Sequence, residues 1–347
     1  MADKTRKTPN EIKDSILLQL KSGPKTIAEI GEVIGSNWLT TEKFLKELID
    51  LKLIIEVFSS PKMKVYRRTD DIAFYGLPFS EDIRKNSASL LFTIAEKWKK
   101  ETGVIPSRTI LQKIAVELVE GSEEKTVKKI PVMRFHYGKT LAVGYEETAR
   151  EDYCDSFSLI NSDNQRLLKI INEYRKLSSR DVQKKQYAKE GMEFYREKEE
   201  KVLNSFSKSD DFKEIEKSLL KWSVYYPNEL GDLFEIFNKF IYSSIIFLNL
   251  ENNGERKEYL NKIMANFHLL WDVMTTSLFL YDSEKHIALD RKELFNQIKT
   301  SILNSKISTV TSVVDDMESE ANSIDPSKII IDNSEKSKEF LHDLMEE

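Results

Sequence analysis

Glycine and proline are scarce in this chain, and their scarcity limits the possible folds more than any other feature. Among 347 residues there are 11 Gly and 8 Pro, so few positions interrupt a helix. Hydrophobic residues make up 40% of the chain, with 18 Phe and 13 Tyr available to fill cores. The sequence therefore predicts a mostly α-helical protein, and its length favours two or three domains.

The formal net charge of −5 is distributed unevenly along the chain. Residues 1–145 carry 25 Lys and Arg against 19 Asp and Glu, a balance of +6. Residues 146–347 carry 28 against 39, a balance of −11. A polyanionic partner would be attracted to the first part and repelled by the second.

Several classes of protein are disfavoured by what the sequence lacks. Cys154 is the single cysteine, which excludes an internal disulfide and a cysteine-based zinc site. The N-terminus has no apolar segment typical of a secretory signal. The two most apolar stretches, residues 230–250 and 263–281, are each interrupted by polar or charged residues, which argues against a membrane span. We expect a soluble, cytoplasmic protein that contacts no membrane.

No arrangement typical of an enzyme is found in the sequence. No two of the four histidines lie within one helical turn of each other, and Glu-x-x-His occurs once, at Glu339 and His342, where a di-iron bundle needs two copies. Gly138-Lys139-Thr140 lacks the earlier glycine of a phosphate-binding loop. We therefore predict no catalytic residue, no metal site and no cofactor.

Two short helices are predicted near the N-terminus. The first begins at Pro9 and carries apolar residues at three- and four-residue steps. The second begins at Thr26, with Glu29 placed three residues on to complete a capping box. Gly35 is positioned to end it in the left-handed conformation.

A third helix and a hairpin are predicted to follow. The helix covers residues 37–51 and is expected to bury one apolar stripe: Leu39 or Trp38, then Phe44, Leu45, Leu48 and Ile49. Two β-rich runs, residues 53–58 and 64–68, are joined by a short polar segment. Three short helices followed by a hairpin is the element order of a winged helix.

The segment GSNWLTTEKFLKELIDLKLI resembles the turn and recognition helix of archaeal-type winged helix-turn-helix regulators. In that pattern Trp-x-Thr, here Trp38, Leu39 and Thr40, leads into a leucine-rich helix. The resemblance covers roughly residues 8–70. It implies a transcriptional regulator whose partner is double-stranded DNA. The alternative is a protein-assembly or scaffold protein that uses the same module for docking.

The recognition helix of such a module enters the major groove, and its hairpin lies against the backbone. Side-chain chemistry then predicts which residues contact bases and which contact phosphates. The predicted DNA-binding residues are Asn37, Trp38, Thr40, Thr41, Lys43, Lys46, Lys62, Lys64, Arg67 and Arg68.

Residues 71–150 form a predicted α+β middle segment. Helices are expected over residues 80–102 and 108–119, the second capped by Ser107, followed by a hairpin that turns near Gly138. Two interpretations stay open. The segment is either a second winged helix that presents Arg134, His136 and Lys139 to DNA, or a connector that packs the first domain against the rest.

Residues 151–305 are predicted to form a helical bundle used for dimerisation or sensing. Its helices are expected over residues 159–177, 180–206, 212–225, 230–248, 257–281 and 291–303. The apolar stripe of residues 230–248 suggests a homodimer, and a small-molecule effector is possible. Residues 306–347 are rich in Asp, Glu and Ser and are expected to form an acidic tail.

Overall fold

The computed structural model describes residues 9–20, 25–50, 54–59, 64–68, 77–143, 157–207 and 211–329. The chain divides into two compact units, residues 1–75 and residues 76–347. Most of the described residues are helical, as the scarcity of glycine and proline predicts. Among these residues, one hydrophobic core lies in the first unit and two lie in the second.

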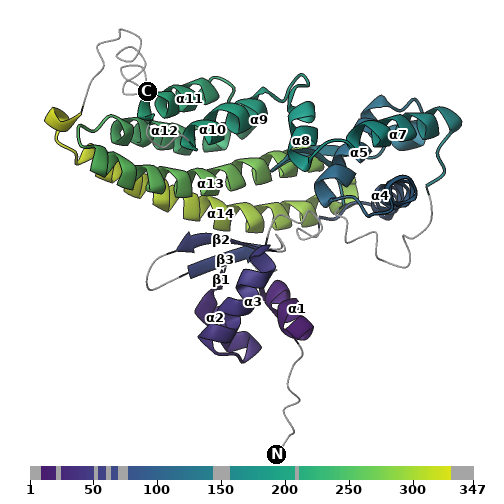
Figure 1. The fold of residues 1–347 in the computed structure, drawn as a ribbon, viewed down its shortest axis with the longest axis horizontal. Coiled ribbons are helices and arrows are strands. Elements are labelled where there is room, and N and C mark those ends of the chain that lie inside the picture. Colours follow the sequence, from purple (N-terminus) through teal and green to yellow (C-terminus); the bar gives the residue numbers. More distant parts are fainter. Residues whose placement is uncertain are drawn as a thin grey trace, which may run out of the picture. The chain divides into compact units, whose positions relative to one another are not determined.

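The first unit combines three helices with a three-stranded antiparallel sheet (Figure 1). Its elements are α1 (Pro9–Gln19), β1 (Lys25–Thr26), α2 (Ile27–Ile34), α3 (Trp38–Asp50), β2 (Ile54–Ser59) and β3 (Lys64–Arg68). The strand order is β1-β3-β2, so β3 lies in the centre of the sheet. The three helices and the hairpin all lie where the sequence predicts them.

Both predicted ends of α2 are confirmed. Thr26 accepts the backbone N–H of Glu29, and the Glu29 carboxylate accepts the backbone N–H of Thr26 at 2.7 Å, which completes the capping box. Gly35 ends the helix with φ of 68°. Gly31 lets α3 approach closely, because a Cβ placed there would meet the Thr41 hydroxyl at 3.3 Å.

The strand β1 was not predicted from the sequence. Its two residues, Lys25 and Thr26, pair with Tyr66 and Val65 of β3. Thr26 is also the residue that caps α2, and its φ and ψ of −72° and 156° belong to extended backbone. The same conformation therefore serves as a helix cap and as a strand, and a two-residue strand leaves no alternating pattern to detect.

The second unit begins with helices and a hairpin that share one core. The elements are α4 (Glu81–Thr102), α5 (Arg108–Gly121), α6 (Lys125–Lys128), β4 (Val132–Phe135), β5 (Gly138–Leu141), α7 (Asn161–Tyr174) and α8 (Ser179–Tyr187). Ser107 caps α5 as predicted, and its hydroxyl accepts the backbone N–H of Ile110. This core extends to Val182 in α8, so the expected boundary at residue 150 does not separate two cores.

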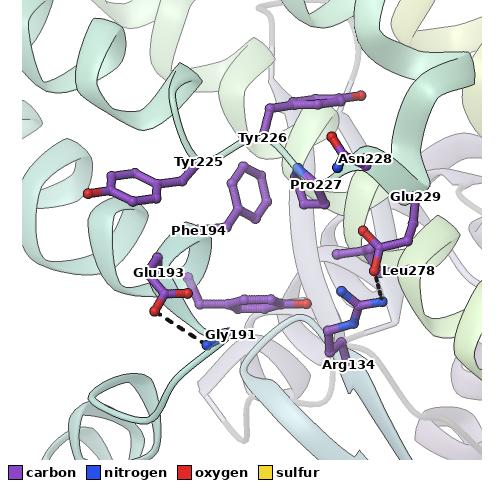
Figure 2. Close-up of a pocket in the computed structure, with 11 residues that line it drawn as sticks. Arg134, Gly191, Glu193, Phe194, Tyr225, Tyr226, Pro227, Asn228, Glu229 and Leu278 are labelled. Atoms are coloured by element: carbon purple, nitrogen blue, oxygen red, sulfur yellow. Dashed lines mark hydrogen bonds and ion pairs between the residues drawn. The ribbon is translucent and has the colours of Figure 1, made fainter.

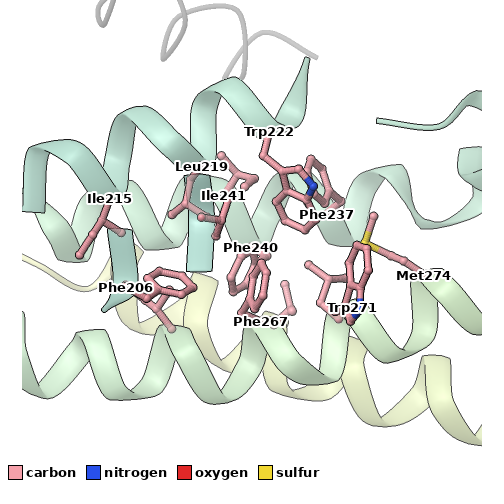
Figure 3. Packing of buried hydrophobic residues seen from close by; sticks show 14 of the residues in the cluster. Phe206, Ile215, Leu219, Trp222, Phe237, Phe240, Ile241, Phe267, Trp271 and Met274 are labelled. Atoms are coloured by element: carbon pink, nitrogen blue, oxygen red, sulfur yellow. The ribbon is translucent and has the colours of Figure 1, made fainter. Parts of the chain in front are cut away.

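The remaining elements of the second unit enclose a larger, aromatic core. They are α9 (Glu193–Glu197), the π-helix η5 (Lys198–Val202), α10 (Leu203–Phe206), α11 (Phe212–Ser223), η6 (Asn228–Leu233), α12 (Phe234–Leu248), α13 (Asn253–Glu284), η7 (Leu289–Arg291), α14 (Lys292–Asn322) and η8 (Pro326–Lys328). The long helices α13 and α14 lie side by side (Figure 1). Figure 3 shows Trp222, Phe240 and Phe267 packed between α11, α12 and α13.

Two predictions for this part of the chain need correction. The helix expected over residues 180–206 is broken after α8, where Gly191 adopts φ of 77°. The acidic tail expected from residue 306 instead begins as helix, because α14 continues to Asn322. Within it Val310, Val314 and Met317 are fully buried at three- and four-residue spacing, while Asp315 and Glu318 face outward and bind Lys239 of α12.

One helix, Gly254–Glu284, is long and apolar enough to cross a membrane by composition. Most of its apolar window is buried against the other helices of the unit, where Phe267 and Leu270 are fully buried. A core helix of a soluble protein has these same properties, so α13 is consistent with a soluble chain.

Candidate nucleic-acid interface

The first turn of α3 uses two of its predicted base-contacting side chains within the unit. The Asn37 side-chain carbonyl accepts the backbone N–H of Thr40 at 2.8 Å, which caps the helix. Thr41 is fully buried, and its hydroxyl donates to the backbone carbonyl of Asn37 at 2.9 Å. The prediction that Thr41 contacts bases is therefore wrong. Thr40 is half-buried and remains a candidate.

The apolar side chains at the start of α3 lie on the surface, contrary to expectation. Trp38 is 44% exposed and Leu39 is 77% exposed, whereas one of them was expected to be buried. The inward stripe of α3 begins at Thr41 and continues through Phe44, Leu45 and Leu48. Because Thr41 occupies the first inward position, the preceding turn is left outside the core.

Val33, in the last turn of α2, is 54% exposed. Val33 precedes the turn between α2 and α3, and the exposed Trp38 and Leu39 follow it. We call these three residues the apolar turn. Val33 and Leu39 were not among the predicted contact residues. For Leu39 a signal was available, because Thr41, Phe44, Leu45 and Leu48 share one helical face that does not include Leu39.

The lysines of this unit differ in whether a carboxylate neutralises them. Lys43 and Lys46 of α3 are exposed and form no ion pair among the described residues. Lys64 of β3 instead donates to Glu42 of α3 at 2.7 Å, and this hydrogen bond lowers the pKa of Glu42 and raises that of Lys64. Lys13 of α1 binds Glu47 in the same way at 2.6 Å.

For three of the predicted hairpin cations, Lys62, Arg67 and Arg68, the structure gives no side-chain contacts. Lys62 lies outside the described residues. Arg67 and Arg68 belong to β3, where their backbones pair with Ile55 and Ile54. Their side chains lie outside the description. Their role as phosphate contacts therefore stays a prediction.

The hairpin of the second unit does not offer its cations to a partner. Arg134 donates to Asp282 through Nε at 2.8 Å and binds Glu229 through Nη2 at 2.8 Å. Burial alone would lower the pKa of Arg134, but the hydrogen bonds and charge of Asp282, with Glu229, raise it above its usual value. Lys139 pairs with Glu120 at 2.6 Å.

The other predicted cation of this hairpin, His136, is buried. Its Nδ1 lies 3.0 Å from the Thr275 hydroxyl, and its Nε2 lies 3.3 Å from the Asp272 carboxylate, which also binds Lys306 at 2.5 Å. The interpretation of residues 71–150 as a second DNA-binding wing is therefore not supported. Each side chain that it requires is held by a carboxylate of the same unit.

A cavity of about 260 Å³ lies in the second unit beside Arg134. Figure 2 shows Phe194, Tyr225 and Tyr226 on one side and the Arg134–Glu229 pair on the other. Glu193 accepts the backbone N–H of Gly191 at 3.3 Å, and Tyr226 donates to the backbone carbonyl of Leu230. The Tyr195 hydroxyl, also in the lining, is buried without a hydrogen-bond partner among the described residues. The cavity combines aromatic walls with the polar groups of Arg134, Asn228 and Glu229, which suits a small molecule that carries both an apolar and a polar part.

Among the described residues, no three His, Cys, Asp or Glu side chains are close enough together to hold a metal ion. Two of the described lysines of the second unit are buried, Lys113 and Lys198, and Lys113 is the more deeply buried. Lys113 of α5 is buried, and its ammonium group donates to the backbone carbonyl of Lys139 at 2.7 Å. Desolvation lowers the pKa of Lys113 to about 7. Because Lys139 belongs to β5, this hydrogen bond from Lys113 connects α5 to the hairpin and stabilises it.

Comparison of the chain with protein-family models, with curated proteins and with solved structures gives no match.

Proposed function

We propose that residues 1–75 form a winged helix-turn-helix that binds double-stranded DNA, and that the protein is a transcriptional regulator. The observation that carries the proposal is the element order α1-β1-α2-α3-β2-β3 with sheet order β1-β3-β2. This order supports a helix-turn-helix formed by α2 and α3, joined at Gly35, with a hairpin following it.

In this proposal α3 enters the major groove with its N-terminal turn against the bases. Thr40 would lie near base edges, while Lys43 and Lys46 further along the helix neutralise phosphates. Both lysines are exposed and form no ion pair among the described residues, so phosphate binding would break no such pair. Lys64 is different, because its ammonium group must first leave Glu42.

Fluorescence anisotropy with random-sequence and genomic duplexes tests the proposal. We expect saturable binding of the full chain that weakens as salt rises, because phosphate contacts release counterions. Lys46→Ala should weaken binding to all duplexes. Lys13→Ala is the matched control, since it removes one charge from a lysine that Glu47 already neutralises. Absence of binding to any duplex at low salt would refute the proposal.

A second candidate function is protein docking, and the apolar turn is the observation that favours it. Val33, Trp38 and Leu39 are three exposed apolar side chains close together in the sequence, and an exposed apolar patch is typical of a protein-interaction site. The two functions separate in the same assay. A docking module would bind duplexes weakly and independently of sequence, with no effect of changes at the apolar turn.

We also propose that the second unit senses a small molecule. The cavity beside Arg134 supports sensing. The apolar stripe that suggested a homodimer does not support dimerisation, because Phe237, Phe240 and Ile241 of α12 are buried in the core of the same chain. The homodimer stays a prediction. Light scattering at micromolar concentration tests it, and a particle of monomer mass would exclude it.

A further inference from the structure

Apart from the half-buried Thr40, the first turn of α3 presents apolar rather than hydrogen-bonding side chains. The polar side chains of Asn37 and Thr41 both make hydrogen bonds within the turn, at 2.8 and 2.9 Å. Asn37 is needed as the helix cap, and Thr41 is fully buried. Of the residues between Asn37 and Thr41, Leu39 is the most exposed, at 77%.

Apolar groups are rare on the edges of DNA bases. In the major groove the C5-methyl group of thymine is the one apolar feature that distinguishes a base pair. A hydrogen-bonding side chain recognises guanine or adenine there, whereas an aliphatic side chain gains free energy only by covering a methyl group. The chemistry of the exposed turn therefore matches thymine better than any other base.

We propose that the first unit recognises thymine methyl groups through Leu39, flanked by Trp38 and Val33. This inference rests on the proposed DNA-binding function and adds the chemical class of the bases that are read. The charges agree with the division of roles along the helix. The first turn of α3 carries no cation, and Lys43 and Lys46 begin one turn later, where phosphates are contacted.

Replacement of thymine by uracil gives a direct test, because it removes only the methyl group and leaves every hydrogen-bonding atom of the base pair. The probe is the tightest-binding duplex selected from random sequences with the full chain. Each thymine of that duplex is replaced by uracil, one position at a time. Burial of one methyl group contributes about 0.8 kcal/mol, so we expect about a fourfold loss of affinity at one or two adjacent positions.

Two further measurements assign the effect to Leu39. At a sensitive position, a T·A to C·G change should weaken binding, and 5-methylcytosine should restore part of the loss because it returns the methyl group. Leu39→Ala should bind the thymine and uracil duplexes equally. Since Leu39 is 77% exposed, this variant is expected to keep the unfolding midpoint of the wild type. Lys46→Ala, the control, should weaken both duplexes by the same factor and keep their ratio.

The outcomes separate this inference from the function on which it rests. Sequence-dependent binding that is unchanged by uracil at every position would overturn recognition by Leu39 and leave DNA binding intact. A methyl effect that persists in Leu39→Ala would also overturn it. Failure to bind any duplex would overturn both, and would favour a protein partner for the apolar turn.

Discussion

Two regions of this chain have helices followed by a basic hairpin, and they differ in where their cations are held. In residues 81–141, Arg134 is bonded to Asp282 and Glu229, and Lys139 is bonded to Glu120. In residues 9–68, the described hairpin cation Lys64 is likewise bonded to Glu42, and the exposed lysines without an ion pair among the described residues, Lys43 and Lys46, lie on helix α3. The same order of elements therefore supports an internal structural role in one region and an external contact in the other.

The comparison indicates that a cation is evidence for nucleic-acid binding only when it lacks a partner in its own unit. In the described part of the first unit, Lys43 and Lys46 of α3 meet this condition, whereas Lys64 of the hairpin does not. The sequence separates Arg134 from Asp282 by 148 positions. No local pattern indicates that these residues meet, because α13 reaches β4 only through tertiary packing. The following predictions test whether the two regions differ as strongly as the structure indicates.

The largest effect is expected for Arg134→Ala. The change would leave Asp282 and Glu229 close together without the guanidinium between them, and loss of one partner of a largely buried ion pair costs about 3–5 kcal/mol. Urea unfolding of the full chain measures the loss. Lys139→Ala is the control in the same hairpin, where Glu120 keeps Lys189 at 3.0 Å, and its expected cost is below about 1 kcal/mol. Equal, small losses would contradict the assignment of Arg134 to the core.

Lys113→Met is expected to change how stability depends on pH. The pKa of Lys113 is about 7 in the folded state and 10.5 when unfolded, so between these values the unfolded chain binds the additional proton. The free energy of unfolding should therefore rise with pH in this interval, by on the order of 3 kcal/mol. The Met variant should lack this part of the rise.

Urea midpoints at several pH values between 7 and 10 provide the comparison. Lys100→Met, an exposed lysine at the end of α4, is the control and should keep the wild-type dependence. Parallel curves for the wild type and Lys113→Met would show that Lys113 is protonated when buried.

Much of the first unit was predictable because its signals are local. The capping box of Thr26 and Glu29, the left-handed Gly35 and the hairpin strands all depend on residues close in sequence. The exposure of Trp38 and Leu39 was not predicted. It depends on Thr41 filling an inward position against Gly31, and a polar residue is not expected there from hydrophobic periodicity.

The second unit was less predictable because its decisive contacts are distant in sequence. The acidic residues after position 305 suggested a solvated tail, although Val310, Val314 and Met317 among them keep a helical spacing. That interpretation gave more weight to the acidic composition of the segment than to the periodicity of its apolar residues. Lys239 binds Asp315 and Glu318, so the same acidic residues contribute to the packing of α14 against α12.

A smaller effect distinguishes Thr40 from Thr41. Thr41→Val removes a buried hydroxyl that is bonded to the Asn37 carbonyl, and we expect a loss of about 1 kcal/mol in unfolding free energy without a change in DNA affinity. Thr40→Ala should leave stability unchanged, because the Asn37 cap uses the backbone N–H of Thr40. It should weaken binding to the preferred duplex by roughly 1–3 kcal/mol and to random duplexes little. Equal losses of affinity for both duplexes would indicate that Thr40 contacts the DNA backbone rather than the bases.

The smallest expected effect is on the salt dependence of DNA binding, which compares paired and unpaired lysines directly. Each phosphate contact contributes about 0.9 to the slope of log affinity against log salt. Lys43→Ala combined with Lys46→Ala should therefore reduce the slope by about 2. Lys64→Ala should reduce it by less than about 1, because Glu42 already neutralises Lys64 and fewer counterions are released.

Glu42→Gln completes this test, because it frees Lys64 without removing any cation. If the ion pair limits Lys64, the variant should bind random duplexes more tightly and with a steeper slope than the wild type. Circular dichroism checks that α3, which carries Glu42, keeps its helix. If Lys64→Ala and Lys46→Ala reduce the slope equally, then Lys64 leaves Glu42 on binding. In that case an ion pair within the unit does not decide whether a cation is available, and the contrast between the two regions would depend on burial alone.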